Sequence, residues 1–116
     1  MEFSFTKENH IGIYELKGKL MGETDGMPII DSFVQNQEEG IDMFIMDLSE
    51  LKLMNSVGIG VLIRLLTKAR KKGGELVLSA PSEYIRNLLV MTKLNTIFTI
   101  FGDKAEALDS FADKAS

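Results

Sequence analysis

The sequence predicts a single α/β domain with a mixed, largely parallel sheet, and three observations lead to this fold class. The chain has 116 residues, which suits one compact domain. From about residue 28 onward, segments of helical periodicity alternate with short apolar segments, as in folds whose strands pair in parallel. The N-terminus instead opens on two strand-like segments joined by a polar turn. We therefore expect the order β-β-α-β-α-β-α-β-α across residues 1–116, with an N-terminal hairpin and about four helices.

The first two strands are expected over residues 3–7 and 10–16. Apolar and polar residues alternate in both segments, so that Ile11 and Ile13 share one side of the second strand. The polar sequence KENH lies between them and is typical of a short turn. The two strands are therefore expected to pair as an antiparallel hairpin.

The first helix is expected to begin at Pro28, because proline is favoured at the first position of a helix. Thr24 and Asp25 precede it as candidate caps, and Gly40 follows as a C-terminal stop. Its apolar stripe consists of Ile29, Ile30, Phe33 and Val34.

The next two elements are a buried strand and a long helix. Residues 42–48 are a nearly continuous apolar run between acids, which predicts a strand covered on both faces. The helix starts at Asn55 or Ser56 and ends before Gly73. Its basic C-terminal residues favour the negative end of the helix dipole, which explains them better than a nucleic-acid patch. Its inward positions are Val57, Val61, Leu62, Leu65, Leu66 and Ala69.

Two strands and two helices complete the chain. Residues 75–79 predict a strand, and the helix after it has Ser82 as its N-cap. Residues 96–101 predict the fifth strand. Asp103 and Glu106 have the spacing of a capping box, so the last helix is expected to begin there.

The composition argues against several classes of function. Cysteine is absent and His10 is the only histidine, so a transition-metal site lacks its usual ligands and no cofactor is implied. The net charge of −4 argues against direct binding of nucleic acid. No apolar run approaches the roughly 18 residues that span a bilayer, and no signal peptide is visible. We expect a cytoplasmic monomer without membrane insertion.

Enzyme motifs are incomplete in this chain. Ser56 and Gly58 resemble half of a nucleophile elbow, but Met54 stands where the first glycine belongs. The glycines that begin at Gly58 lack a third member, because Ile63 occupies its position, and no phosphate loop follows. Asp47 is better explained as a strand-terminal acid that hydrogen-bonds the following turn than as a general acid or base. We expect no enzyme; a hydrolase or nucleotide-binding enzyme would need a deep polar pocket around Ser56.

The start of the long helix allows two interpretations of Ser56. Either Asn55 or Ser56 is able to cap the first free amides, a role worth about 1 kcal/mol. Gly58 and Gly60 lower helix propensity, so the close approach of another backbone or of a partner has to explain them. From the residues alone, a serine that only caps the helix and a functional serine are equally supported.

The stretch DLSELKLMNSVGIGVL, residues 47–62, resembles the signature of the STAS domain found in bacterial anti-sigma factor antagonists. The resemblance extends over the chain, since GKL at 18–20, KKGGELVLSAPS at 71–82 and KLNTIFTIFGDKAEAL at 93–108 also match segments of that family. It implies a single STAS domain over residues 1–116.

The resemblance also implies a function. Such an antagonist binds a cytoplasmic anti-sigma factor that is also an ATP-dependent serine kinase, and thereby frees a sigma factor. The kinase phosphorylates the serine that corresponds to Ser56 and so releases the antagonist, and a serine phosphatase resets the switch. The partner-binding residues implied are Met21, Asn55, Ser56, Val57 and Gly58.

Three of these positions depart from the family pattern. Asn55 replaces the usual aspartate, Val57 replaces a small hydroxyl residue, and Met21 stands where many members have aspartate. An alternative within the same fold is therefore a constitutive STAS subunit of another assembly, such as a lipid-transport complex or a stress-signalling scaffold. In that case Ser56 would be structural.

Overall fold

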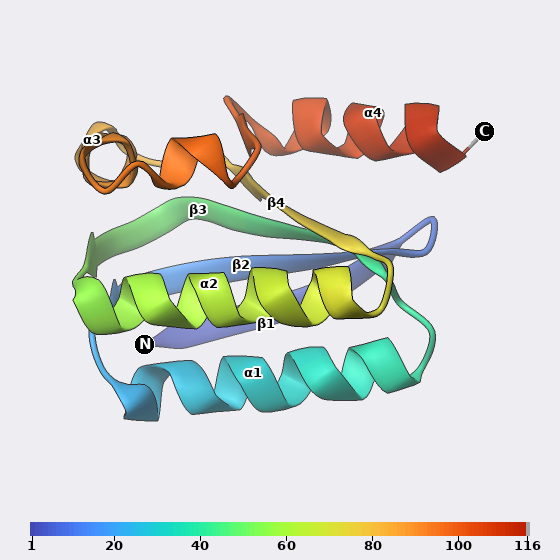
Figure 1. Cartoon of the computed structure of the whole chain (residues 1–116), viewed down its shortest axis with the longest axis horizontal. Coiled ribbons are helices and arrows are strands. Elements are labelled where there is room, and N and C mark those ends of the chain that lie inside the picture. The colour runs from blue at the N-terminus through green and yellow to red at the C-terminus, as the bar shows by residue number, and fades with distance from the viewer. Residues whose placement is uncertain (116) are drawn as a thin grey trace.

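The computed structural model describes residues 1–115 and confirms the predicted fold class (Figure 1). Its five strands form one sheet in the order β1-β2-β3-β4-β5, in which β1 and β2 are antiparallel and all later neighbours are parallel. The strands are β1 (Glu2–Glu8), β2 (Ile11–Leu20), β3 (Met43–Met54), β4 (Glu75–Ser79) and β5 (Ile100–Phe101). The helices are α1 (Glu23–Glu38), α2 (Ser56–Lys71), α3 (Glu83–Met91) and α4 (Lys104–Ala115), with a 3₁₀ turn, η1 (Leu94–Thr96).

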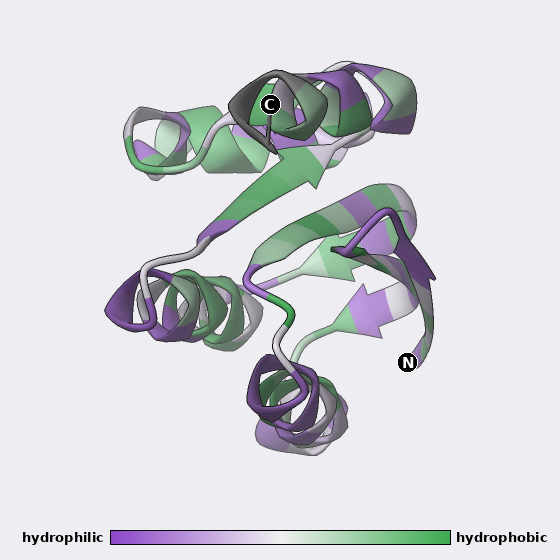
Figure 2. Cartoon of the chain, turned by 90° about the vertical axis from the view of Figure 1, so that its right-hand side faces the viewer, coloured by the Kyte–Doolittle hydropathy of each residue, from purple (hydrophilic) through white to green (hydrophobic). Residues whose placement is uncertain are grey.

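Two hydrophobic cores of unequal size hold the layers together. The larger core lies between the sheet and α1 and α2, and Ile85 and Leu89 of α3 extend it. The smaller core joins Ile13 and Ile45 of the sheet to Phe111 of α4, which lies on the far side of the sheet from α1 and α2 (Figure 1). Figure 2 shows the apolar strand β4 between these helical layers. No helix within residues 1–115 has the length and hydrophobicity needed to cross a membrane.

The hairpin forms as predicted, and its turn consists of Asn9 and His10. Both residues have positive φ, 51° and 70°, and Glu8 pairs with Ile11 across the turn. Positive φ at both central residues is the geometry of a type I′ turn, whose twist matches that of the paired strands. His10 is exposed there.

The prediction that the first helix begins at Pro28 is wrong, because α1 already begins at Glu23. Its N-cap is Gly22, which makes no side-chain cap, so neither Thr24 nor Asp25 has the predicted role. The first turn packs so closely on α2 that a Cβ on Gly26 would overlap the Val61 side chain. The residues of this first turn show no apolar periodicity, so the sequence alone does not predict that they are helical. Gly40 ends the helix region as predicted, with φ of 98°.

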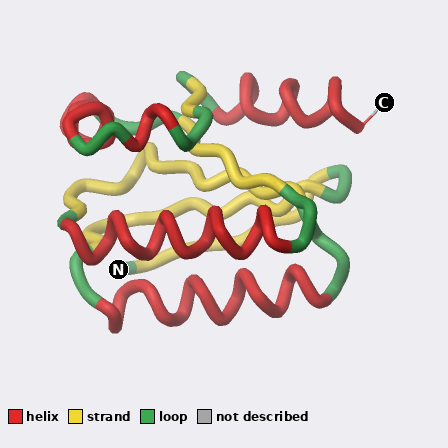
Figure 3. The backbone as a smooth tube through the Cα atoms, in the orientation of Figure 1, coloured by secondary structure: helices red, strands yellow, loops and turns green. Residues whose placement is uncertain are grey.

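Two strand predictions also need correction. Only Ile100–Phe101 of the predicted strand 96–101 is extended, and a helical turn precedes it (Figure 3). Phe98 is buried in the larger core, so its hydrophobicity reflects packing rather than strand structure. Strand β3 continues to Met54, beyond the predicted end at residue 48. Asp47 therefore lies inside the strand and not at its end.

Candidate partner-binding site

Ser56 is the first residue of α2 and lies at the end of β3, separated from the strand only by Asn55. Its side chain is exposed. Within residues 1–115, no side chain or backbone group hydrogen-bonds to the Ser56 hydroxyl. The hydroxyl is therefore accessible to a macromolecule that approaches this end of the sheet.

Asn55, rather than Ser56, is the N-cap of α2. The Asn55 side-chain oxygen accepts hydrogen bonds from the Val57 and Gly58 backbone N–H groups, both at 3.1 Å. Its backbone is extended, with φ of −119°, as expected of an N-cap. The choice that the sequence left open is thus decided: Ser56 has no capping role.

Asn55 also connects α2 to the loop between β2 and α1. Its side-chain nitrogen donates to the Met21 carbonyl at 2.9 Å. The Met21 N–H in turn donates to the Asp25 carboxylate at 3.1 Å. One residue earlier, the Leu20 carbonyl lies so close to Gly58 that a Cβ there would overlap it. Gly58 is therefore required by the approach of another backbone, one of the two explanations that the sequence allowed.

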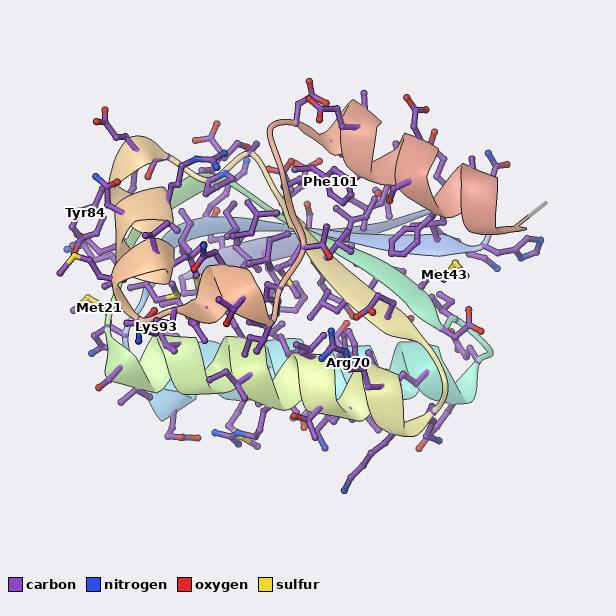
Figure 4. All side chains as sticks on the ribbon, turned by 45° about the horizontal axis from the view of Figure 1, so that its top comes forward. Met21, Met43, Arg70, Tyr84, Lys93 and Phe101 are labelled. Carbon is purple, nitrogen blue, oxygen red and sulfur yellow. The ribbon has the colours of Figure 1, made fainter. Side chains whose placement is uncertain are left out.

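Exposed apolar side chains belong to Val57, which follows Ser56 directly, and to Met21, whose carbonyl is bonded to Asn55. The side chains of Met21 and Val57 are 41% and 38% exposed, so the prediction that Val57 faces inward is wrong, because this first-turn position lies outside the buried face of α2. Among the described residues, Gly60 faces open space one turn further along α2. Figure 4 shows Met21, Tyr84 and Lys93 at the end of the molecule where α2 begins. We call Met21, Asn55, Ser56 and Val57 the Ser56 surface. Gly58 lies beneath this surface, buried against β2.

The geometry does not support the serine-hydrolase alternative. His10 precedes Ile11, which pairs with the first residue of β3, whereas Ser56 follows the last. The two side chains are therefore at opposite ends of the sheet and cannot form a Ser–His pair. The described residues also enclose no cavity at Ser56.

Asp47 has partners that sequence reasoning missed. One carboxylate oxygen accepts from the Ser49 N–H at 3.0 Å and hydroxyl at 2.6 Å, and the other accepts from the buried Ser79 hydroxyl at 3.1 Å. In place of the expected bond to a following turn, Asp47 accepts two bonds from Ser49 within β3 and one from Ser79 of β4. Asp47 therefore links β3 to β4, in which Ser79 is the residue paired with it across the sheet. Sequence spacing gives no signal for such a contact between residues 32 positions apart.

Known proteins with related sequences and structures share this architecture. An anti-sigma F factor antagonist of Paenibacillus polymyxa is 27% identical over 110 residues, which cover 93% of this chain and 94% of that protein. The crystal structure of an anti-sigma factor antagonist from Mycobacterium paratuberculosis has a TM-score of 0.82 and 16% identity, over 94% of this chain and 92% of that one. Phosphorylated SpoIIAA of Bacillus has a TM-score of 0.74 and 19% identity, over 95% and 99% of the two chains.

The sequence pattern of the STAS domain matches residues 2–107, which is nearly the whole chain. The structure agrees with that assignment, since its mixed five-stranded sheet and four helices match the fold of the structural relatives with TM-scores of 0.74 to 0.82. This chain belongs to the STAS domain family.

Proposed function

We propose that this protein is an anti-sigma factor antagonist whose partner is a cytoplasmic anti-sigma factor with serine kinase activity. The observation that carries the proposal is the accessible hydroxyl of Ser56 at a helix start, which bonds to no group within residues 1–115 and has exposed apolar side chains beside it. Binding of the unmodified protein frees a sigma factor. Phosphorylation of Ser56 by the kinase ends the complex, and a serine phosphatase restores it. The name of the Paenibacillus relative supports this role.

The fold should tolerate a phosphate at Ser56. A phosphoserine carries about −1.5 to −2 charges at neutral pH. At the positive end of a helix dipole a negative charge gains about 0.3–1 kcal/mol. The amides of Val57 and Gly58 are already bonded to Asn55, so the phosphate gains less from free N–H groups than at an uncapped helix start. We expect a small net effect on folding.

The complex should not tolerate the same phosphate. At a packed interface its charge has to be desolvated, and a like charge opposite it costs several kcal/mol. Each 1.4 kcal/mol is a factor of about ten in affinity. The loss at the interface therefore exceeds the small effect on the fold, which is the property that a reversible binding switch requires.

The first test is phosphorylation itself. The purified protein is incubated with ATP and each anti-sigma factor kinase of its host, and Ser56→Ala serves as the control. We expect one kinase to produce a phosphopeptide that contains Ser56 and is missing from the control. Absence of such a peptide with every kinase would refute the switch.

Binding measurements distinguish the switch from a constitutive subunit. The exposed apolar side chains of Met21 and Val57 suit a permanent interface as well, so this alternative has support of its own. A switch predicts that Ser56→Asp abolishes binding to the kinase, while Ser56→Ala binds and is never released by ATP. Equal binding of both variants, with unchanged melting temperatures, would favour the constitutive subunit.

A further inference from the structure

We propose that Asn55 is a positioning residue for partner binding, which holds the β2–α1 loop and the start of α2 as one rigid surface. This inference rests on the function proposed above. It concerns how the Ser56 surface is ordered before a partner arrives, and it assigns a role to the uncharged amide of Asn55.

The Met21 backbone is held from two sides. Its N–H donates to the Asp25 carboxylate at 3.1 Å, and its carbonyl accepts from the Asn55 amide at 2.9 Å. With both backbone groups bonded to side chains, the Met21 side chain is left to project into solvent, and it is 41% exposed. Because segments with few contacts open readily, these two hydrogen bonds should make the Met21 backbone less mobile than a loop without them.

Two neighbouring contacts attach the β2–α1 loop to the start of α2. The Leu20 carbonyl packs against Gly58, and the next carbonyl along, that of Met21, bonds to Asn55. Both contacts join the end of β2 to the first turn of α2. The loop therefore approaches α2 over two consecutive residues, and among the described residues the one hydrogen bond in that contact is the bond from Asn55.

The chemistry of this bond requires an amide. The Asn55 oxygen accepts from the Val57 and Gly58 N–H groups while its nitrogen donates to Met21. An aspartate would retain the cap, since its carboxylate still accepts, but it has no donor and would place a negative charge against the Met21 carbonyl oxygen. Serine or threonine would also cap the helix but would lack the second polar atom.

The arrangement specifies the kind of partner contact. Met21 and Val57 of the Ser56 surface present exposed apolar side chains, so the partner surface that covers them must be apolar there. Ordering a loop on binding costs affinity, and a loop that is already held in place avoids this cost. Asn55 thus supports partner affinity through Met21, without itself having to contact the partner.

The test compares two exchanges of amide and carboxylate. In Asn55→Asp the cap is retained and the donor to Met21 is lost. Asp103→Asn is the matched control, because the Asp103 carboxylate accepts from the Glu106 N–H at 2.8 Å at the start of α4, on the other side of the sheet. Asp25→Ala releases Met21 from its other side. For each variant we measure the melting temperature, amide hydrogen exchange of residues 19–26, and affinity for the anti-sigma factor kinase that phosphorylates the wild type.

We expect Asn55→Asp to melt close to the wild type, to exchange faster in residues 19–26, and to bind the kinase about two- to tenfold more weakly, as for one lost hydrogen bond. Asp25→Ala should show the same faster exchange and weaker binding, and Asp103→Asn neither. Unchanged exchange in Asn55→Asp, or faster exchange with wild-type affinity, overturns the inference. Exchange is measured on the protein alone, so a failure of the proposed function, in which no kinase binds the wild type, is distinguishable from a failure of Asn55 to hold the loop.

Discussion

At the scale of single residues, Gly58 and Gly60 have opposite surroundings although they lie two positions apart in α2. The Leu20 carbonyl and the Met54 side chain occupy the place where a Cβ of Gly58 would lie, whereas a Cβ on Gly60 would meet no atom of the described residues within 4 Å. Of these two glycines, only Gly58 is needed for the close packing of α2 on β2. The open surface at Gly60 lies next to the Ser56 surface on the same helix.

This difference predicts opposite effects of the same substitution. Gly60→Ala should raise the free energy of unfolding by up to about 1 kcal/mol, because alanine is the better helix former. Gly58→Ala should lower it by about 1–3 kcal/mol, as for overpacking, because the backbone of β2 has to move. Urea unfolding of both variants provides the measurement, with each serving as the control for the other. A stabilised Gly58→Ala would show that β2 and α2 are not in close contact.

At the scale of elements, the close approach of α1 and α2 explains where α1 begins. Gly26 of α1 lies against Val61 of α2, in a contact that would be too short for any larger residue. An ion pair between Arg64 and Glu23, at 3.0 Å, joins the same two helices, but both side chains are largely exposed. Surface ion pairs contribute about 0–1 kcal/mol, so the packing at Gly26 is the more important of the two contacts.

A double-mutant cycle tests this helix contact. Gly26→Ala should destabilise the wild type, because the new methyl group overlaps Val61. In a Val61→Ala background the same substitution should cost nothing or stabilise, since room is available and alanine favours a helix. We expect a coupling energy of about 0.5–3 kcal/mol between the two positions from thermal or urea unfolding. Additive effects would contradict the close packing.

At the scale of the whole molecule, Tyr14 of β2 joins the other strand of the hairpin, β1, to α1 and to the central strand β3. Its ring is fully buried and lies near those of Phe5 and Phe33, with centroids 4.8 and 6.2 Å away. Its hydroxyl oxygen accepts from the Asn36 amide and hydrogen-bonds the Ser32 hydroxyl, both at 2.8 Å. Burial raises the pKa of the Tyr14 phenol, and the two hydrogen bonds oppose this shift only in part.

The raised pKa of Tyr14 predicts how global stability depends on pH. In the unfolded chain a tyrosine loses its proton near its ordinary pKa of about 10, while the folded protein keeps Tyr14 neutral to higher pH. Its contribution to stability is therefore complete below about pH 10 and falls as the pH rises further. Tyr14→Phe should be less stable at neutral pH by about 1–3 kcal/mol, since the polar partners of the hydroxyl lose their bonds. Above pH 10 it should lose stability less steeply than the wild type.

The exposed Tyr84 provides the matched control for this pH dependence. Tyr84→Phe removes a hydroxyl without removing a buried hydrogen bond, and its stability at neutral pH should equal that of the wild type. The free energy of unfolding in urea, measured from pH 8 upward, compares the three proteins. Parallel curves for the wild type and Tyr14→Phe would contradict the role assigned to Tyr14.

The sequence by itself determined the order of the elements and the sheet with its N-terminal hairpin, and it proposed where the site lies. These follow from local signals: alternation of residue types in strands, helical periodicity in α2, and the motif around Ser56. The early start of α1, the short β5 and the buried bonds of Asp47 were decided by tertiary structure. Each depends on contacts between residues distant in sequence, which periodicity does not encode.

The same division applies to the site. The sequence predicts Met21, Asn55, Ser56, Val57 and Gly58 as partner-binding residues, and this stays a prediction; it left open whether Asn55 or Ser56 caps α2. Only the folded chain brings the Met21 carbonyl to the Asn55 amide, across 34 positions, and thereby assigns the cap to Asn55 and leaves Ser56 accessible. The physical reason lies in the two kinds of bond that Asn55 makes. The cap joins its oxygen to nearby amides of α2, so the sequence shows that such a cap is possible. The bond from its nitrogen to the Met21 carbonyl depends on how β2 and α2 pack, and the sequence does not show it.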